Sequence, residues 1–280
     1  MTTTWRALWA ETASEFGRPQ ARWLCETASG CDAAEFLDEL DAVPTQRMVA
    51  HLDAMIARLR DGEPLQYVLG HWAFRQLDLM VDPRVLIPRP ETEEVVGVAL
   101  SKVAGRSSRR CLDLGCGSGA IGLSLAAELP IDGTRVWMTD VSDDALDVAR
   151  ANAAGIGRAA ANVRFVQGDW YSALDGVDPG FDLIVANPPY VADGSTEIES
   201  VVVAHEPRQA LFSGADGLDA LRLIIACSPE WLADDGWLVL EIGADQGPAV
   251  AALLVDAGHV EVSITRDAAG HQRIAAARRP

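Results

Sequence analysis

The stretch CLDLGCGSGAIGLSLAAEL, residues 111–129, decides the fold. A short apolar run passes through a glycine-rich turn into residues with the apolar spacing of a helix. This pattern is typical of the first unit of a doubly wound α/β sheet, which binds adenosine-containing ligands at that turn. The glycines allow a tight turn and let backbone N–H groups at the start of the helix approach a ligand closely. We therefore expect a ligand site where this strand ends.

Downstream, short apolar runs alternate with stretches of helical spacing, which predicts a mainly parallel, doubly wound α/β sheet. The last two runs flank DAAG at 267–270 and are expected to form a terminal hairpin, so the sheet should have seven strands. The runs after the first are RVWMTD (135–140), VRFVQGD (163–169), FDLIVANPPY (181–190), WLVLEIG (237–243), VEVSIT (260–265) and HQRIAAAR (271–278).

The residues before this sheet follow a different pattern. Apolar residues keep helical spacing up to about Arg60, and Pro19 and Gly30 divide the first part into shorter helices. Beyond Gly62 the period changes to that of short strands. We expect a small all-helical domain at 1–62, a linking β-hairpin at 63–90 and a ligand-binding α/β domain at 91–280.

Composition excludes several classes of protein. With 49% apolar and 23% charged residues among 280, the chain has an ordinary globular mix. Its 41 acidic residues against 23 basic ones give a net charge of −18. Such a charge repels polyanions at long range, so we expect no direct nucleic-acid partner.

Cysteine and histidine usage argues against metal and disulfide chemistry. The five cysteines have no C-x-x-C spacing, which fits a reducing cytoplasm, and the five histidines are scattered without an H-E-x-x-H motif. No G-x-S-x-G elbow or phosphate-binding P-loop occurs. The N-terminus lacks the features of a signal peptide, and no run of about 18 apolar residues occurs. We expect a cytoplasmic monomer with no metal site and no membrane segment.

Acidic residues end the next two strands after the glycine turn. Asp140 follows Gly119 at a distance where a carboxylate can accept hydrogen bonds from both hydroxyls of a ribose. Asp169 and Trp170 end the third strand, where they could flank an adenine ring, although a tryptophan packed in the core fits equally well. The glycine spacing can also be aligned with a dinucleotide fingerprint, so the turn alone leaves an NAD(P) oxidoreductase open.

The four residues Asn187-Pro188-Pro189-Tyr190 follow the fourth strand and narrow the chemistry. Two consecutive prolines remove two N–H donors and stiffen the backbone, so the Asn187 amide oxygen and the Pro188 carbonyl are free to accept hydrogen bonds. An –NH₂ group fits this acceptor pair, and Tyr190 can lie against a planar amide or base. We expect Asn187, Pro188 and Tyr190 to be catalytic, with Pro189 also contacting substrate.

The glycine loop, Asp140, Asp169-Trp170 and the 187–190 motif follow one another along the chain. This order of motifs resembles that of class I S-adenosylmethionine-dependent methyltransferases that modify amino groups. More narrowly, the chain resembles the bacterial peptide chain release factor N5-glutamine methyltransferases. Cys116 stands where that family often has threonine, and His205 stands where an aromatic residue is common. The narrower resemblance rests on EPLQYVLGHWAF (63–74), LIPRPETE (86–93), DLGCGSGAIGLSLA (113–126), GDWYSAL (168–174), NPPYV (187–191) and EPRQAL (206–211).

The resemblance implies transfer of a methyl group from S-adenosylmethionine, leaving S-adenosylhomocysteine, to the glutamine of the Gly-Gly-Gln loop of class 1 release factors in translation termination. The helical domain at 1–62 would recognise the release factor, and residues 187–190 would receive the glutamine. The residues that would hold the donor are Gly115, Cys116, Gly117, Ser118, Gly119, Asp140, Asp169, Trp170 and Asn187.

Other functions remain open at this stage. A glutamine methyltransferase acting on a ribosomal protein would share the catalytic residues. A DNA adenine-N6 methyltransferase would use the same four-residue motif on a flipped base, but it would need a basic cleft. A binding module without turnover would have no physical need for the acceptor pair at Asn187 and Pro188. We treat Arg89 and Glu91 as structural residues.

Overall fold

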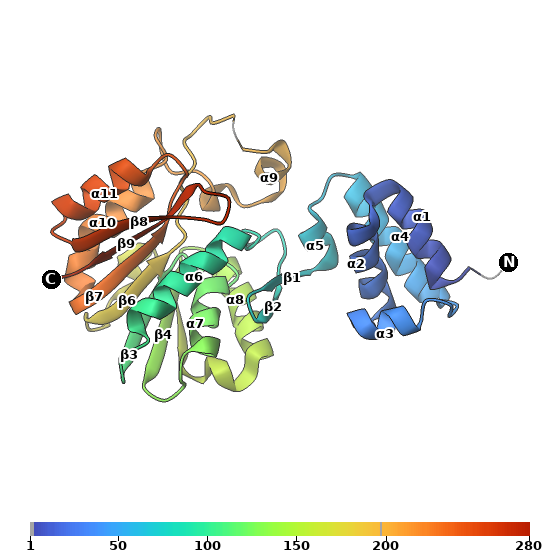
Figure 1. Ribbon diagram of the computed structural model, residues 1–280, viewed down its shortest axis with the longest axis horizontal. Coiled ribbons are helices and arrows are strands. Elements are labelled where there is room, and N and C mark those ends of the chain that lie inside the picture. The colour runs from blue at the N-terminus through green and yellow to red at the C-terminus, as the bar shows by residue number, and fades with distance from the viewer. Residues whose placement is uncertain (1–2, 197) are drawn as a thin grey trace. The chain divides into compact units, whose positions relative to one another are not determined.

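The computed structural model describes residues 3–196 and 198–280. The chain divides into two compact units, Met1–His71 and Trp72–Pro280, and each is described by itself (Figure 1). Nowhere in the described residues is there a helix of the length and apolar character needed to cross a bilayer.

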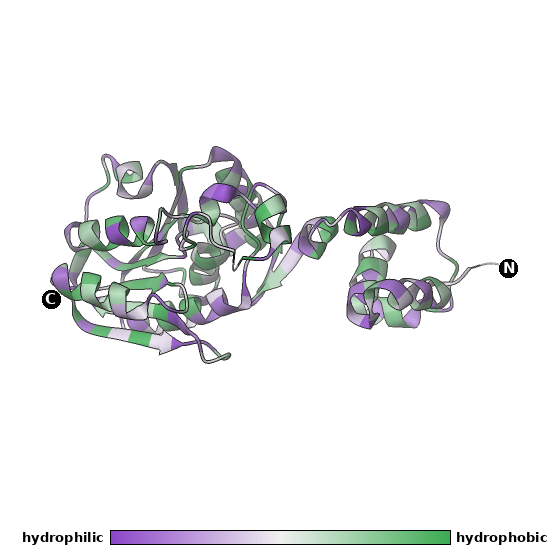
Figure 2. Ribbon diagram, turned by 90° about the horizontal axis from the view of Figure 1, so that it is seen from above, coloured by the Kyte–Doolittle hydropathy of each residue, from purple (hydrophilic) through white to green (hydrophobic). Residues whose placement is uncertain are grey.

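The N-terminal unit is helical, as the sequence predicts. Its core contains Trp5, Leu24, Phe36, Leu52 and Met55, all buried, and the rings of Trp5 and Phe36 meet edge to face at 5.8 Å. In Figure 2 its helices carry hydrophilic and hydrophobic residues together, as expected of helices with one buried face. The helices are α1 (Trp5–Phe16), α2 (Arg18–Ser29), α3 (Ala33–Asp38), α4 (Gln46–Arg60) and α5 (Leu65–Leu69).

Gly17, and not Pro19, separates the first two helices. Gly17 has φ of 81°, a conformation that favours glycine, while Pro19 lies in the first turn of α2, where a missing N–H costs no intrahelical bond. Gly30 ends α2 with φ of 73°, and Asp32 then caps α3 with its side chain. The predicted division into short helices is confirmed, with the first break two residues earlier.

The hairpin expected over 63–90 is shorter than predicted. It consists of β1 (His71–Phe74) and β2 (Leu77–Met80). The residues before it form α5, which begins after Pro64 and ends at the left-handed Gly70. Proline at a helix start and glycine at its end delimit this short helix, a signal that the change of hydrophobic period obscures.

From Trp72 onward the hairpin is part of the second unit. Phe74 and Leu79 are buried in one of that unit's cores. The side chain of Asn152, on α8 (Asp143–Ile156), accepts a hydrogen bond from the Met80 N–H at 2.7 Å and donates to the Met80 carbonyl at 3.0 Å. It also donates to the Ser118 carbonyl at 2.8 Å, so one amide ties the hairpin to the glycine loop.

The second unit contains the predicted seven-stranded sheet, in the order β5-β4-β3-β6-β7-β9-β8. Within this sheet, strands β3 to β7 run parallel, and β9 pairs antiparallel with both β7 and β8. The chain moves from β3 outward to β5 and then returns to the other side of β3 at β6. The strands are β3 (Arg109–Leu114), β4 (Thr134–Asp140), β5 (Val163–Gln167), β6 (Phe181–Ala186), β7 (Leu232–Glu241), β8 (Val260–Arg266) and β9 (Gln272–Arg278).

Helices cover both faces of this sheet, which confirms the doubly wound α/β class. Along β6, Leu183 and Val185 face one core while Ile184 and Ala186 face the other, as the two-residue period of a strand requires. The helices α6 (Pro90–Val103), α7 (Ala120–Glu128) and α8 pack on the first core, and α10 (Asp219–Trp231) and α11 (Gly247–Asp256) pack on the second. A short helix, α9 (Ser200–His205), lies in the long connection between β6 and α10.

A glycine sets how closely α7 approaches the sheet. A Cβ atom at Gly122 would lie 2.7 Å from Cγ of Met138 and 2.9 Å from Oδ2 of Asp113. Both distances are shorter than a carbon atom tolerates, so α7 can rest on β3 and β4 only with glycine here.

We expect Gly122→Ala to lower the free energy of unfolding of the second unit by about 1–3 kcal/mol, because the added methyl group overpacks this contact. The matched control is Gly97→Ala on the exposed side of α6, where an added Cβ meets no described atom within 4 Å. That control should raise the free energy of unfolding by up to about 1 kcal/mol, since alanine is the better helix former. Denaturant unfolding measures both, and equal effects of the two substitutions would contradict the packing argument.

Candidate active site

A pocket opens at the carboxyl ends of β3, β4 and β6, where the strand order reverses, and this is where doubly wound sheets bind ligands. Most of the predicted site residues line it, whereas Gly119, Pro188 and Tyr190 are not among its lining residues. The predicted residues that do line it are Gly115, Cys116, Gly117, Ser118, Asp140, Asp169, Trp170, Asn187 and Pro189.

The glycine loop has a backbone that other residues rarely adopt. Gly115, Gly117 and Gly119 have φ of 70°, 53° and 87°. A Cβ atom at Gly117 would meet no described atom within 4 Å, so the loop backbone there faces open space. At Gly119 it would lie 2.9 Å from Leu123, which makes this third glycine a requirement of the turn into α7.

Asp140 is held in place by the backbone around it. Its Oδ2 accepts a hydrogen bond from the Gly117 N–H at 2.9 Å, and its Oδ1 accepts one from the Ser142 N–H at 2.9 Å. Burial raises the pKa of this carboxyl group, and these backbone hydrogen bonds partly oppose the rise. Each carboxylate oxygen keeps a further lone pair, so Asp140 can still accept hydrogen bonds from a ligand's hydroxyl groups.

Trp170 forms part of the wall beside the loop. Its φ is 45°, and it begins a short 3₁₀ helix, Trp170–Leu174. A Cβ atom at Gly115 would lie 3.3 Å from the indole ring, so the ring rests against the first glycine of the loop. The indole is half-buried and lines the pocket, unlike a tryptophan enclosed in the core.

Asn187 is oriented by a residue that the sequence did not single out. Its Nδ2 donates a hydrogen bond to Oγ1 of Thr92 at 3.2 Å, and Thr92 Oγ1 donates one to Oε2 of Glu241 at 2.6 Å. Thr92 lies in the first turn of α6 and also lines the pocket. The amide nitrogen of Asn187 is therefore engaged, which leaves Oδ1 as its available acceptor.

Tyr190 lies differently from the position expected for it. Its hydroxyl donates to Oε1 of Glu241 at 3.3 Å, and its backbone carbonyl accepts a hydrogen bond from Gln246 at 3.0 Å. The tyrosine is thus anchored to the end of β7 by the same carboxylate that holds Thr92, and its ring is not part of the pocket wall.

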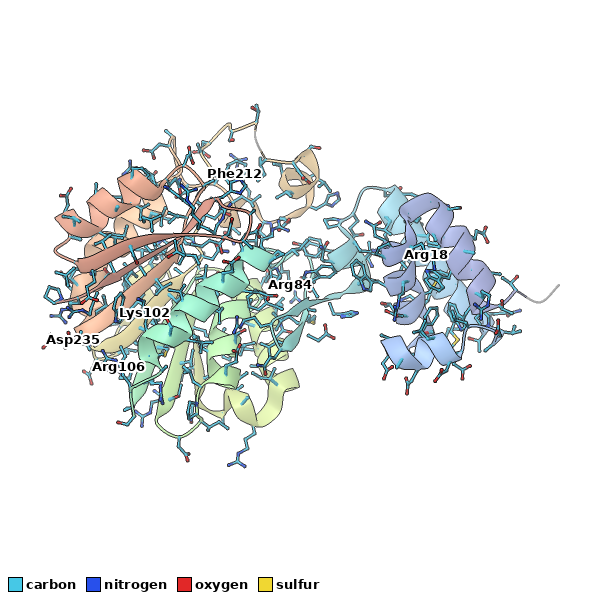
Figure 3. All side chains as sticks on the ribbon, in the orientation of Figure 1. Arg18, Arg84, Lys102, Arg106, Phe212 and Asp235 are labelled. Carbon is cyan, nitrogen blue, oxygen red and sulfur yellow. The ribbon has the colours of Figure 1, made fainter. Side chains whose placement is uncertain are left out.

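Two further loops complete the pocket, and no sequence motif in either loop predicted this. Arg84, labelled in Figure 3, lies on the segment before α6, lines the pocket and pairs with Asp82 at 2.6 Å. The second loop contributes Gln209. Buried Glu206 joins the two loops, because it forms an ion pair with Arg89 and accepts a hydrogen bond from the Ile87 N–H at 3.0 Å. The segments LIPRPETE and EPRQAL indicated these loops by resemblance only.

A second carboxylate is buried beneath the glycine loop. Asp113, at the end of β3, accepts a hydrogen bond from the Gly122 N–H at 2.8 Å through Oδ2, while Oδ1 has no partner among the described residues. Burial raises the pKa of Asp113 to about 7, and the nearby charge of Asp140 adds to the rise. Within the described residues, no group of three or more His, Cys, Asp or Glu side chains could hold a metal ion.

We expect Asp113 to make stability fall with rising pH. Its pKa is raised on folding, so its stabilising contribution is fully present below about pH 4 and is lost as the pH rises through about 7. At one pKa unit per about 1.4 kcal/mol, this loss is on the order of 1–4 kcal/mol. Asp113→Asn should remove that part of the slope, which denaturant unfolding between pH 5 and 8 would measure. An unchanged slope in the variant would contradict the assignment.

Two family models match parts of this chain. Residues 96–216 match the methyltransferase small domain family, and residues 3–70 match the PrmC N-terminal domain. A release factor glutamine methyltransferase of Xylella fastidiosa (strain 9a5c) is 40% identical over 274 residues, which cover 98% of each chain. One of Vibrio cholerae is 42% identical over 235 residues, which cover 84% of this chain and 80% of the relative.

Among solved structures, the 16S rRNA N2 G1207 methyltransferase of T. thermophilus, in complex with AdoMet and guanosine, has a TM-score of 0.53 to this chain. It is 18% identical, and the match covers 75% of this chain and 50% of that one. This likeness extends to the fold alone.

Proposed function

Because the chain belongs to the release factor glutamine methyltransferase family, we propose that it transfers a methyl group from S-adenosylmethionine to a side-chain amide nitrogen in peptide chain release factors. The acceptor is N5 of the glutamine in the Gly-Gly-Gln loop of class 1 release factors, and the reaction serves translation termination in the cytoplasm. The observation that carries this proposal is that Asn187, with its amide nitrogen engaged by Thr92, lines the same pocket as the glycine loop and Asp140.

The residues of the pocket fit an adenosyl donor. At Gly117 the backbone is open to close approach, and Asp140 keeps lone pairs for ribose hydroxyls. Asp169 and Trp170 line the pocket where they can flank the adenine. When bound, the donor supplies an electrophilic methyl group and is converted to S-adenosylhomocysteine.

The acceptor pair at Asn187 and Pro188 addresses the difficulty of the reaction. An amide nitrogen is a poor nucleophile, because its lone pair is delocalised into the carbonyl, and no ordinary side chain could deprotonate it fully. We assign the two amide protons of the glutamine to Asn187 Oδ1 and to the Pro188 carbonyl, although of these two residues only Asn187 is among those that line the pocket. These acceptors polarise the amide and bind it more tightly as its nitrogen becomes positive, so they favour the transition state over the ground state. The methylated nitrogen then releases one of its two protons to solvent, which leaves a neutral N-methyl amide.

The remaining parts of the chain receive supporting roles in this proposal. The helices of the N-terminal unit recognise the release factor, and Pro189 contributes to the wall around the glutamine side chain. The net charge of −18 disfavours the alternative substrate, duplex DNA, which is a polyanion.

The decisive test is methyl transfer from labelled S-adenosylmethionine to a purified release factor, its Gln→Ala loop variant and a DNA control, with the modified peptide identified by mass spectrometry. We expect label on the loop glutamine only, and none on the Gln→Ala variant. Label on DNA, or on another protein of a cell extract in place of the release factor, would overturn the substrate assignment.

In the same assay, Asn187→Ala should lower kcat by about 10²–10³, the usual effect of removing one group that stabilises a developing charge. Binding of S-adenosylhomocysteine, measured by calorimetry, should persist and weaken far less than kcat, because Asn187 is one of several residues expected to hold the donor. The matched control is Asn162→Ala. Asn162 donates to the Ile131 carbonyl, and both residues precede strands, so they lie at the end of the sheet opposite to the pocket. Near-normal turnover of Asn187→Ala with intact ligand binding would refute the role given to the Asn187 oxygen.

A further inference from the structure

Two side chains from distant parts of the sequence, those of Thr92 and Tyr190, meet at one buried carboxylate. Glu241 ends β7 and is 1% exposed, and Thr92, in the first turn of α6, is 3% exposed. Oε2 of Glu241 accepts the hydroxyl of Thr92 at 2.6 Å, and Oε1 accepts the hydroxyl of Tyr190 at 3.3 Å. Thr92 Oγ1 in turn accepts Nδ2 of Asn187 at 3.2 Å. A chain of hydrogen bonds therefore runs from Asn187 through Thr92 to Glu241.

The direction of this chain follows from its donors and acceptors. A carboxylate can only accept hydrogen bonds, and a threonine hydroxyl has a single proton. With that proton directed to Glu241, Thr92 presents only a lone pair to Asn187. A lone pair can pair with the NH₂ end of the asparagine amide but not with its oxygen. Ionised Glu241 thus determines which end of the Asn187 amide turns away from Thr92.

We propose that Glu241 is a positioning residue, which acts through Thr92 to present the Asn187 oxygen to the substrate amide and through Tyr190 to fix the segment that carries it. This rests on the proposed function, in which the Asn187 oxygen accepts a proton of the glutamine amide. Glu241 does not touch the substrate, and it contributes by orienting an acceptor in advance.

Protonation of Glu241 would remove this constraint. A neutral carboxyl group can donate to Tyr190, which leaves the chain as it is, or to Thr92, whose own proton is then free to point to Asn187. In the second case the asparagine would satisfy that donor with its oxygen and turn its NH₂ group, a donor, toward the substrate. The amide NH₂ of the glutamine would then face a donor in place of an acceptor in part of the molecules, so the protonated enzyme should be less active.

The surroundings of Glu241 place this change near neutral pH. Burial raises its pKa to about 7, and the charge of Glu91 on α6 adds to the rise. The hydroxyls of Thr92 and Tyr190 and the positive charge of Arg273 on β9 oppose it. The carboxylate is thus the main form only above about pH 7, and kcat should rise with pH through that value.

The first experiment measures kcat and both KM values against pH for the wild type and Glu241→Gln. A glutamine oxygen can accept from Thr92 at every pH, and its NH₂ group can donate to the Tyr190 oxygen. For a pKa of about 7, the ratio of kcat in Glu241→Gln to kcat in the wild type should grow between pH 8 and 6, by up to about tenfold. A ratio that does not change with pH would overturn the proposal.

Asp113→Asn is the control for this pH profile, because Asp113 has a similarly raised pKa but lies outside the chain of hydrogen bonds. It should keep the acid limb of the wild type. Asp182→Asn, at the opposite end of β6 from Asn187, controls for general weakening of that strand and should also keep the acid limb. Loss of the limb in Asp113→Asn would assign it to Asp113 and overturn the proposal.

A matched pair at Thr92 tests the connecting hydroxyl. Thr92→Val keeps the shape and removes the hydroxyl, and we expect kcat to fall at least about tenfold with both KM values nearly unchanged, as for an interaction that acts in the transition state. Thr92→Ser keeps a hydroxyl at this position and should retain most of the wild-type kcat. Equal kcat in the two variants, or a loss confined to KM, would overturn the proposal.

A measurement without substrate separates this inference from the proposed function. In infrared difference spectra, the bands of two protonated carboxyl groups, Asp113 and Glu241, should titrate near pH 7. The band of Glu241 is the one that disappears in Glu241→Gln and remains in Asp113→Asn, and it should shift to higher pH in Thr92→Val, which loses a donor to the carboxylate. Should the wild type fail to methylate the release factor, the proposed function fails, while this titration still shows whether Glu241 is coupled to Thr92. A Glu241 band that Thr92→Val leaves unmoved would overturn the inference.

Discussion

The register of β3 with its two parallel neighbours is the constraint on which the rest of the site depends. Leu114 pairs with Thr139 of β4 on one side and with Ala186 of β6 on the other. The residues that follow these three positions are Gly115, Asp140 and Asn187, and they therefore emerge at one level of the sheet. Hydrogen bonding between strands thus gathers the loop, the carboxylate and the amide, which are far apart in the sequence.

This dependence explains how much of the site the sequence could predict. The glycine loop, Asp140 and Asn187 each follow a recognisable strand, and the ends of parallel strands meet at one edge, so period and position suffice to bring them together. Thr92 lies two residues after Pro90, in the first turn of α6, and by its position looks like a residue that caps the helix. Glu241 is the polar residue that ends an apolar strand, and other strands of this sheet also end in polar residues. Their connection depends on how α6 packs beside β7, and a single sequence does not specify that contact.

Tyr190 is a further residue whose position the sequence could not predict. An aromatic ring such as that of Tyr190 can stack on a planar substrate, but its hydroxyl needs a partner once it is partly buried, and the carboxylate of Glu241 supplies one.

Burying Asp113 and Glu241 raises the pKa of each to about 7, so the folded protein tolerates two carboxyl groups that favour the neutral form below that pH. Such costs are typical of residues retained for function and not for stability.

The amide of Asn152 has a mechanical consequence for the glycine loop. It bonds both polar groups of the Met80 backbone and the Ser118 carbonyl, so strand β2 and the loop share a single side chain. Any displacement of the hairpin must either carry Ser118 with it or leave buried polar groups unpaired, at a cost of about 1–3 kcal/mol each. A ligand that shifts Ser118 on binding to the loop would therefore also act on the hairpin, and by linkage the position of the hairpin would affect the affinity of the loop for that ligand.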